Sequence, residues 1–212
     1  MIPSEITLTS LERDALTELV NIGVSHAAAS LRRMVGEQVL LSVPSVEVVT
    51  QVVAVKLIGQ RESDRLVAVR QAFEGVFSGR ALLIFPEPKC LELVRAVAGD
   101  AVSAEDLAEM EDEALAETGN IILNGCLATI GNMLQQSLDV SLPEVLRGDG
   151  HLLFDVTRDR PPDGLVLFLY INFSIRQREI TGYIAMVMDL PSMAALKHLI
   201  DKFIQRVVGV EP

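Results

Sequence analysis

The sequence contains no tryptophan, and aromatic residues make up only 4% of its 212 residues. Half of the residues are apolar, so the chain can form a substantial core, built mainly from Val, Leu, Ile and Ala. The length fits one large domain or two closely joined halves. No apolar run approaches the roughly 20 residues that cross a bilayer. The N-terminus also lacks the basic and apolar segments of a signal peptide. We therefore expect a cytoplasmic protein.

Basic residues are few. Lys and Arg together number 18 against 29 Asp and Glu, which gives a net charge of −11. Nucleic acids and anionic membrane surfaces both attract proteins rich in Lys and Arg. The composition therefore argues against both as partners.

Residues for metal binding and nucleophilic catalysis are also scarce. Cys90 and Cys126 are the only cysteines, and neither belongs to a Cys-x-x-Cys or Cys/His cluster, which argues against a structural zinc site. Both lie in apolar helical stretches, so we expect them to be buried and inert. The three histidines lie near no recognisable nucleophile motif, and no glycine-rich phosphate-binding loop is present.

A polar pattern occurs twice, 99 residues apart. It consists of an acid, then Glu four residues later, Asn three residues after that, and Pro 23 residues further on. The first copy is Asp14, Glu18, Asn21 and Pro44, and the second is Glu113, Glu117, Asn120 and Pro143. The repetition indicates a duplicated architecture.

Each copy of the pattern lies in a segment with helical periodicity, where positions i, i+4 and i+7 share one face. An Asn side chain is not basic enough to remove a proton at neutral pH, but it can orient a water molecule by hydrogen bonding. A neighbouring Glu can hold a Lys or Arg of a partner. A solvated helix face would explain one copy, but it explains two matched copies less well. A di-metal carboxylate site is disfavoured, because such helical sites use Glu-x-x-His and both copies have Asn instead.

The order of the remaining elements supports an α+β fold. Residues 10–35 have an apolar stripe that follows a Thr9/Glu12 capping box, which predicts a long helix. Strands are predicted at 45–58, 66–77 and 79–86, followed by a helix at 88–98. The second half repeats this order, with a helix at 103–138, strands at 144–156, 164–176 and 181–188, and a helix at 191–207. We expect two pseudo-twofold-related helix-strand-strand-strand-helix units, forming one antiparallel sheet with the two long helices packed on one face.

The segments Asn21–Ala28 (NIGVSHAA) and Gly119–Ile122 (GNII) resemble the two helix signatures of the CheC/CheX/FliY chemotaxis phosphatases. The pattern of Asp or Ser, Glu, Asn and Pro is similar to that family's motif, and its double occurrence is similar to CheC. The resemblance covers nearly the whole chain, and it implies a single CheC-like domain over residues 1–212 with internal repeats at about 9–99 and 103–207. Glu113 departs from the motif, because Asp or Ser is usual there.

The resemblance also implies an activity. Members of the family hydrolyse the aspartyl phosphate of CheY-like response regulators in two-component signalling. By position, Asn21 and Asn120 would orient the attacking water, and Glu18 and Glu117 would contact a lysine of the receiver domain. Asp14, Glu113, Pro44 and Pro143 would support them. The chain would need no cofactor of its own, because the receiver supplies Mg²⁺.

Two other functions remain open at the level of the sequence. The chain could be a non-enzymatic adaptor that binds a receiver domain or a CheD-like partner, or a structural part of the flagellar switch. Both Glu/Asn pairs are intact, which favours the phosphatase, because neither docking nor scaffolding requires an amide that orients water.

Overall fold

The computed structural model describes residues 6–62, 65–98, 103–156, 164–175 and 178–209. The first half contains α1 (Ser10–Val35), β1 (Val39–Ser42), β2 (Val46–Thr50), α2 (Gln51–Gly59), β3 (Leu66–Gly75), β4 (Gly79–Pro86) and α3 (Glu87–Ala98). The second half contains α4 (Ala104–Glu109), α5 (Glu111–Met133), β5 (Leu138–Val140), β6 (Glu144–Gly148), α6 (Gly150–Leu153), β7 (Leu165–Ile175), β8 (Arg178–Met188) and α7 (Leu190–Val208). None of the helices in these ranges is both long and apolar enough to span a membrane.

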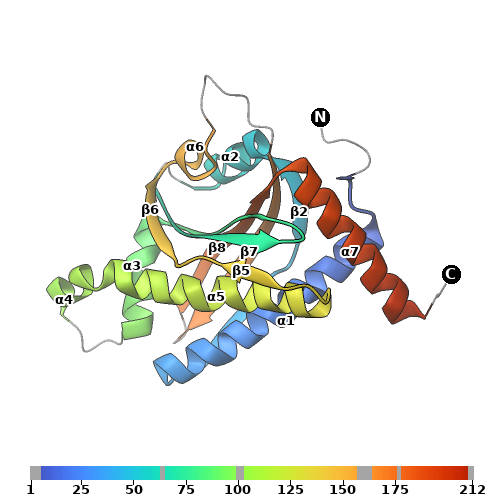
Figure 1. Cartoon of the computed structure of the whole chain (residues 1–212). Helices are drawn as coiled ribbons and strands as arrows, with labels where there is room; N and C mark the ends of the chain where they lie inside the picture. Colours follow the sequence, from blue (N-terminus) through green and yellow to red (C-terminus); the bar gives the residue numbers. More distant parts are fainter. Residues whose placement is uncertain (1–5, 63–64, 99–102, 157–163, 176–177, 210–212) are drawn as a thin grey trace.

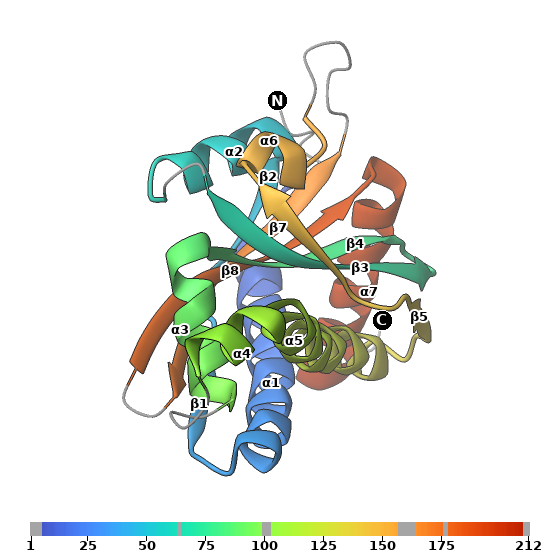
Figure 2. The same ribbon diagram turned by 90° about the vertical axis from the view of Figure 1, so that its left-hand side faces the viewer.

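One antiparallel sheet runs through the molecule in the order β1-β7-β8-β4-β3-β5, with β2 also pairing with β7 and β6 with β3. The first strands of each half therefore hydrogen-bond to a strand of the other half. The long helices α1 and α5 pack on one face of the sheet together with α3 and α7, and the short helices α2 and α6 cover the opposite face (Figures 1 and 2). The predicted α+β fold, with a single antiparallel sheet and two long helices on one face, is confirmed.

Strand pairing relates the two halves residue by residue. Val46 pairs with Leu169, and Val145, which lies 99 residues after Val46, pairs with Val69. The counterpart of Val69 in β3 is therefore Leu169 in β7, one hundred positions later. This register identifies Ile171 as the counterpart of Gln71.

The predicted bounds of α1 are confirmed, and so is its capping box. The Thr9 hydroxyl accepts a hydrogen bond from the backbone of Glu12, and the Glu12 carboxylate accepts one from the Thr9 backbone. At the other end, Gly36 has a φ of 74°, which favours glycine and ends the helix.

Other predicted elements differ from the structure. The segment predicted as a strand over 45–58 is a strand only as far as Thr50, whose side chain caps helix α2 by accepting a hydrogen bond from Val53 N. Ala54 and Ile58 on α2 are buried against the sheet, so tertiary packing outweighs the β-branched composition. The helix predicted over 103–138 is divided at Met110 into α4 and α5, and the short strands β1 and β5 were not predicted.

The two long helices cross at very close range (Figures 1 and 2). A Cβ atom added to Gly23 would lie 2.8 Å from Cys126 Cα and 2.9 Å from Gly125 O, both of which are backbone atoms. Glycine in a helix interior is destabilising relative to alanine, but the approach of α5 requires it at this position of α1. This crossing fixes the relative positions of the two copies of the polar pattern.

We predict that Gly23→Ala lowers the free energy of unfolding by about 2 kcal/mol, because the two backbones must move apart. Urea denaturation measures this change. The matched control is Gly59→Ala in α2, where an added Cβ meets nothing within 4 Å and stability should be unchanged or slightly higher. Equal stability of Gly23→Ala and the unaltered protein would contradict the crossing.

Cys90 and Cys126 are both buried, as expected, and both thiols are free. Burial raises the pKa of each thiol to about 12. Because the thiolate is the reactive form, we predict that neither cysteine reacts with an aromatic disulfide reagent at pH 8 until urea unfolds the protein. Spectrophotometric thiol titration checks this. Rapid reaction of the folded protein would show that a cysteine is accessible.

Candidate functional site

The first copy of the polar pattern extends from α1 to the segment that joins β1 and β2. Asp14 and Glu18 are exposed on α1, Asn21 is half-buried on the same helix, and Pro44 is exposed after β1. The structure therefore brings Asn21 to the chain segment that contains Pro44, although the two are far apart in sequence.

The Asn21 side chain is fully engaged with backbone atoms. Its Nδ2 donates to Val43 O at 2.9 Å and to Thr17 O at 3.0 Å, and its Oδ1 accepts from Val43 N at 2.9 Å. Both N–H bonds and one oxygen lone pair are used. Asn21 thus holds the residue before Pro44 against α1, as a backbone strand partner would.

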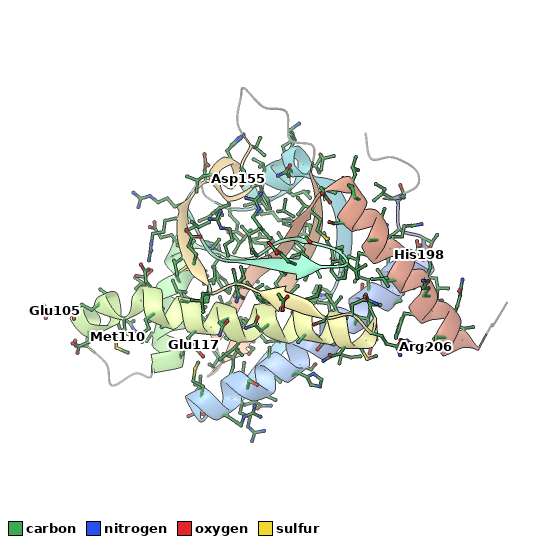
Figure 3. The ribbon with its side chains drawn as sticks, viewed as in Figure 1. Glu105, Met110, Glu117, Asp155, His198 and Arg206 are labelled. Atoms are coloured by element: carbon green, nitrogen blue, oxygen red, sulfur yellow. The ribbon has the colours of Figure 1, made fainter. Side chains whose placement is uncertain are left out.

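The second copy extends from α5 to the segment that joins β5 and β6. Glu113 and Glu117 are exposed on α5, while Asn120 and Pro143 are half-buried. Figure 3 labels Glu117 on α5, which crosses the front of the view. In the part of the chain that the structure describes, neither Glu117 nor its counterpart Glu18 forms an ion pair. Both carboxylates can therefore receive a cation from a partner.

The hydrogen bonds of Asn120 differ from those of Asn21. Asn120 Oδ1 accepts from Gln71 Nε2 at 3.1 Å and from Asn124 Nδ2 at 2.7 Å. Gln71 Nε2 also donates to the backbone oxygen of Ser141 at 2.9 Å. Asn120 Nδ2 donates to no atom of the described residues. The oxygen of this amide is therefore occupied, and its two N–H bonds remain available.

Gln71 was not predicted as a site residue from the sequence. It lies on β3 among apolar residues, and only 1% of its surface is exposed. One sequence signal marks Gln71: it is an amide on a strand face where the neighbouring inward residues are apolar. Its contact with Asn120 joins residues 49 positions apart, which local patterns do not reveal.

The residues before the two prolines are placed differently. Val43, before Pro44, is 1% exposed and belongs to the core, whereas Leu142, before Pro143, is 88% exposed. The second copy therefore presents an apolar side chain to solvent at the residue before its proline, and the first copy does not.

The acidic start of α5 is attached to β6 by Arg147. Its guanidinium donates to Asp112 at 2.5 Å and to Glu111 at 3.1 Å, and the hydrogen bond to Asp112 is the main reason that the pKa of Arg147 is raised. These contacts hold β6, and with it the Pro143 segment, beside α5. No group of three His, Cys, Asp or Glu side chains within the described ranges is placed to hold a metal ion.

Two family models match the chain. The model described as chemotaxis phosphatase CheX matches residues 67–160, and the CheC-like family model matches residues 11–48. The chain is 26% identical over 206 residues to a Bacillus subtilis (strain 168) protein named flagellar motor switch phosphatase FliY. The match covers 94% of this chain and 51% of that protein, so the chain spans about half the length of this curated relative.

Solved structures share the fold. Thermotoga maritima FliY superposes with a TM-score of 0.70 at 21% identity, covering 92% of this chain and 98% of that one. The FliM middle domain of Vibrio alginolyticus gives a TM-score of 0.61 at 12% identity, covering 87% of this chain and 99% of that one. A CheX protein of Desulfovibrio desulfuricans gives 0.50 at 21% identity, with 80% and 99% covered.

Three observations agree with one another: the two copies of the polar pattern, the fold built around them, and the matches to both family models. The resemblance of the chain to the CheC/CheX/FliY chemotaxis phosphatases is thus confirmed by its matches to the CheX and CheC-like models and by its similarity to FliY.

Proposed function

We propose that this chain is a phosphatase that hydrolyses the aspartyl phosphate of a CheY-like response regulator. The observation that carries the proposal is a Glu/Asn pair on one face of α5, in which Glu117 is exposed and Asn120 has two available N–H donors. The name of the Bacillus subtilis relative, flagellar motor switch phosphatase, supports the same activity. The cytoplasmic location expected from the sequence is part of this proposal.

In the proposed reaction, the oxygen of a water molecule attacks phosphorus, and the bond from phosphorus to the aspartyl oxygen breaks. The electron pair of that bond remains on the aspartate, which becomes a carboxylate, and the water loses its proton to solvent. An amide cannot accept this proton at neutral pH. The Asn therefore contributes position, and holding the water in line with the breaking bond lowers the entropic part of the barrier.

The partner contributes the remaining groups. Glu117 receives a lysine ammonium of the receiver, which fixes the orientation of the two proteins. Mg²⁺ bound by the receiver neutralises the charge on the phosphoryl oxygens. No cofactor is assigned to the chain itself.

The alternative is an adaptor that binds a receiver, or a CheD-like protein, without accelerating hydrolysis. The two functions differ in one measurable quantity, which is the rate of phosphate loss from the bound receiver. Binding alone does not require the free N–H bonds of an asparagine.

The test measures phosphate release from a phosphorylated CheY-type receiver with catalytic amounts of this protein. We predict acceleration by the unaltered protein and loss of at least about 100-fold in the double variant Asn21→Ala/Asn120→Ala, which removes both predicted water-orienting amides. Asn132→Ala is the matched control, because Asn132 is exposed on the same helix as Asn120 and outside the pattern. Circular dichroism verifies that each variant is folded.

The same experiment separates the two functions. Binding without acceleration would leave the adaptor, and acceleration that survives in the folded double variant would show that the amides do not orient the water. Absence of both binding and acceleration would exclude both functions for this receiver class.

A second prediction concerns docking through Leu142, the exposed side chain beside Pro143. Burial of this side chain by the receiver would contribute about 2 kcal/mol to binding. We predict that Leu142→Ser raises KM about 30-fold and changes kcat little. Leu152→Ser is the control, because Leu152 is also exposed but lies on α6, across the sheet from α5. Equal KM values for Leu142→Ser and the unaltered protein would contradict the docking role.

A further inference from the structure

We infer that the two copies of the pattern have different roles: Glu117 and Asn120 form the working site, Asn21 is a structural clamp, and Gln71 is a positioning residue that directs the Asn120 amide toward the receiver. This inference rests on the proposed function and assigns it to one half of the molecule. The sequence motif alone treats the two copies as equivalent.

A backbone group that can only donate or only accept a hydrogen bond fixes which way the nitrogen and oxygen of each side-chain amide point. Ser141 O can only accept, so the Gln71 atom that faces it is the nitrogen. The same nitrogen donates to Asn120, so the Asn120 atom that faces Gln71 is the oxygen. Asn120 Nδ2 must then point away from this network. Exchanging the oxygen and nitrogen of any one amide would place like atoms together.

The opposite result follows for the first copy. Val43 N can only donate and Val43 O can only accept, so Asn21 Oδ1 faces the former and Nδ2 the latter. The second N–H of Asn21 is held by Thr17 O. A water or phosphoryl oxygen therefore finds no donor at Asn21 unless the Val43 segment separates from α1.

Two sequence differences produce this divergence. Ile171 stands at the counterpart of Gln71, so the side chain at this position of β7 cannot donate a hydrogen bond to the Asn21 oxygen. Ser25 stands 99 residues before Asn124, and its hydroxyl donates to the backbone oxygen of Asn21 and not to its side chain. The Asn21 amide accordingly pairs with the backbone of Val43.

Gln71 also carries an energetic cost that a purely structural residue would avoid. Its Oε1 is buried and has no hydrogen-bond partner among the described residues. Leaving a buried acceptor unpaired destabilises the folded protein. The apolar counterpart Ile171 fills the same place in the fold without this cost. The function of the Gln71 nitrogen explains why an amide stands here: it donates hydrogen bonds to both Asn120 Oδ1 and Ser141 O.

An outward Asn120 Nδ2 suits the proposed reaction. A water molecule has two lone pairs, and one can accept a hydrogen bond from Nδ2 while the other attacks phosphorus. The second N–H of Asn120 can donate to a phosphoryl oxygen, where negative charge is concentrated. With Oδ1 already held by two donors, the amide cannot rotate to present its oxygen without breaking both bonds.

The first experiment compares single variants in the phosphate-release assay. We predict that Asn120→Ala lowers kcat per folded molecule about 100-fold, and that Asn21→Ala lowers stability without lowering kcat per folded molecule. If Asn21→Ala does not fold, Glu18→Gln and Glu117→Gln replace the comparison, because both side chains are exposed. Glu117→Gln should then lower kcat/KM about tenfold, and Glu18→Gln should not.

The second experiment tests Gln71. Gln71→Met keeps the shape of the side chain and removes its donors. We predict a fall in kcat of about 10- to 100-fold with KM unchanged, because the receiver still docks while the Asn120 amide is free to rotate. Ile171→Leu, at the counterpart position, is the control for altered packing, and its kcat should equal that of the unaltered protein.

These results separate the inference from the proposed function. No acceleration by the unaltered protein would overturn the proposed function. Acceleration that is lost in folded Asn21→Ala, or retained in Asn120→Ala, would overturn only the assignment to α5. If Gln71→Met lowers both kcat and the free energy of unfolding and also raises KM, Gln71 acts only through packing, and its positioning role is contradicted.

Discussion

The hydrogen bond between an asparagine side chain and a backbone group of fixed polarity decides what each copy of the pattern can do. A peptide N–H only donates and a peptide C=O only accepts, so a side-chain amide that faces either one has no choice of orientation. In the first copy, both atoms of the Asn21 amide face Val43, and the side chain completes the fold. In the second copy, Gln71 stands between the backbone and Asn120, so the Asn120 oxygen faces Gln71 and its Nδ2 has no acceptor among the described residues.

The duplicated architecture explains how such a difference can arise without loss of the fold. Each half supplies the first strands of its own sequence to the third strand of the other half, so neither half has a complete sheet alone. The crossing of α1 and α5 at Gly23 then ties the two helices at a distance that allows no added side chain. With the scaffold shared in this way, one copy can serve stability and the other can serve chemistry. The FliM middle domain, which shares the fold at 12% identity, shows how far sequences can diverge on this scaffold.

The sequence predicted the elements that depend on local signals. The bounds of α1 follow from its capping box and its apolar stripe, and the strands of the β3–β4 hairpin were predicted at 66–77 and 79–86. The regular spacing of both patterns placed the Glu and Asn side chains on helix faces. Helix α2 was missed because its valines favour a strand locally, and only burial against the sheet makes it helical. The difference between Asn21 and Asn120 was not predictable from spacing, because it depends on Gln71, which is distant in sequence from both helices.

The side-chain amide signals of Asn21 and Asn120 provide the most direct test of the account. In a nitrogen–proton NMR spectrum, they can be followed while a phosphorylated receiver, or one carrying a stable phosphoryl analogue, is added. We predict that the Asn120 signals shift in a saturable manner and that the Asn21 signals remain in place. Saturable shifts at Asn21 with none at Asn120 would contradict it, because the receiver would then engage the amide that the structure holds against Val43.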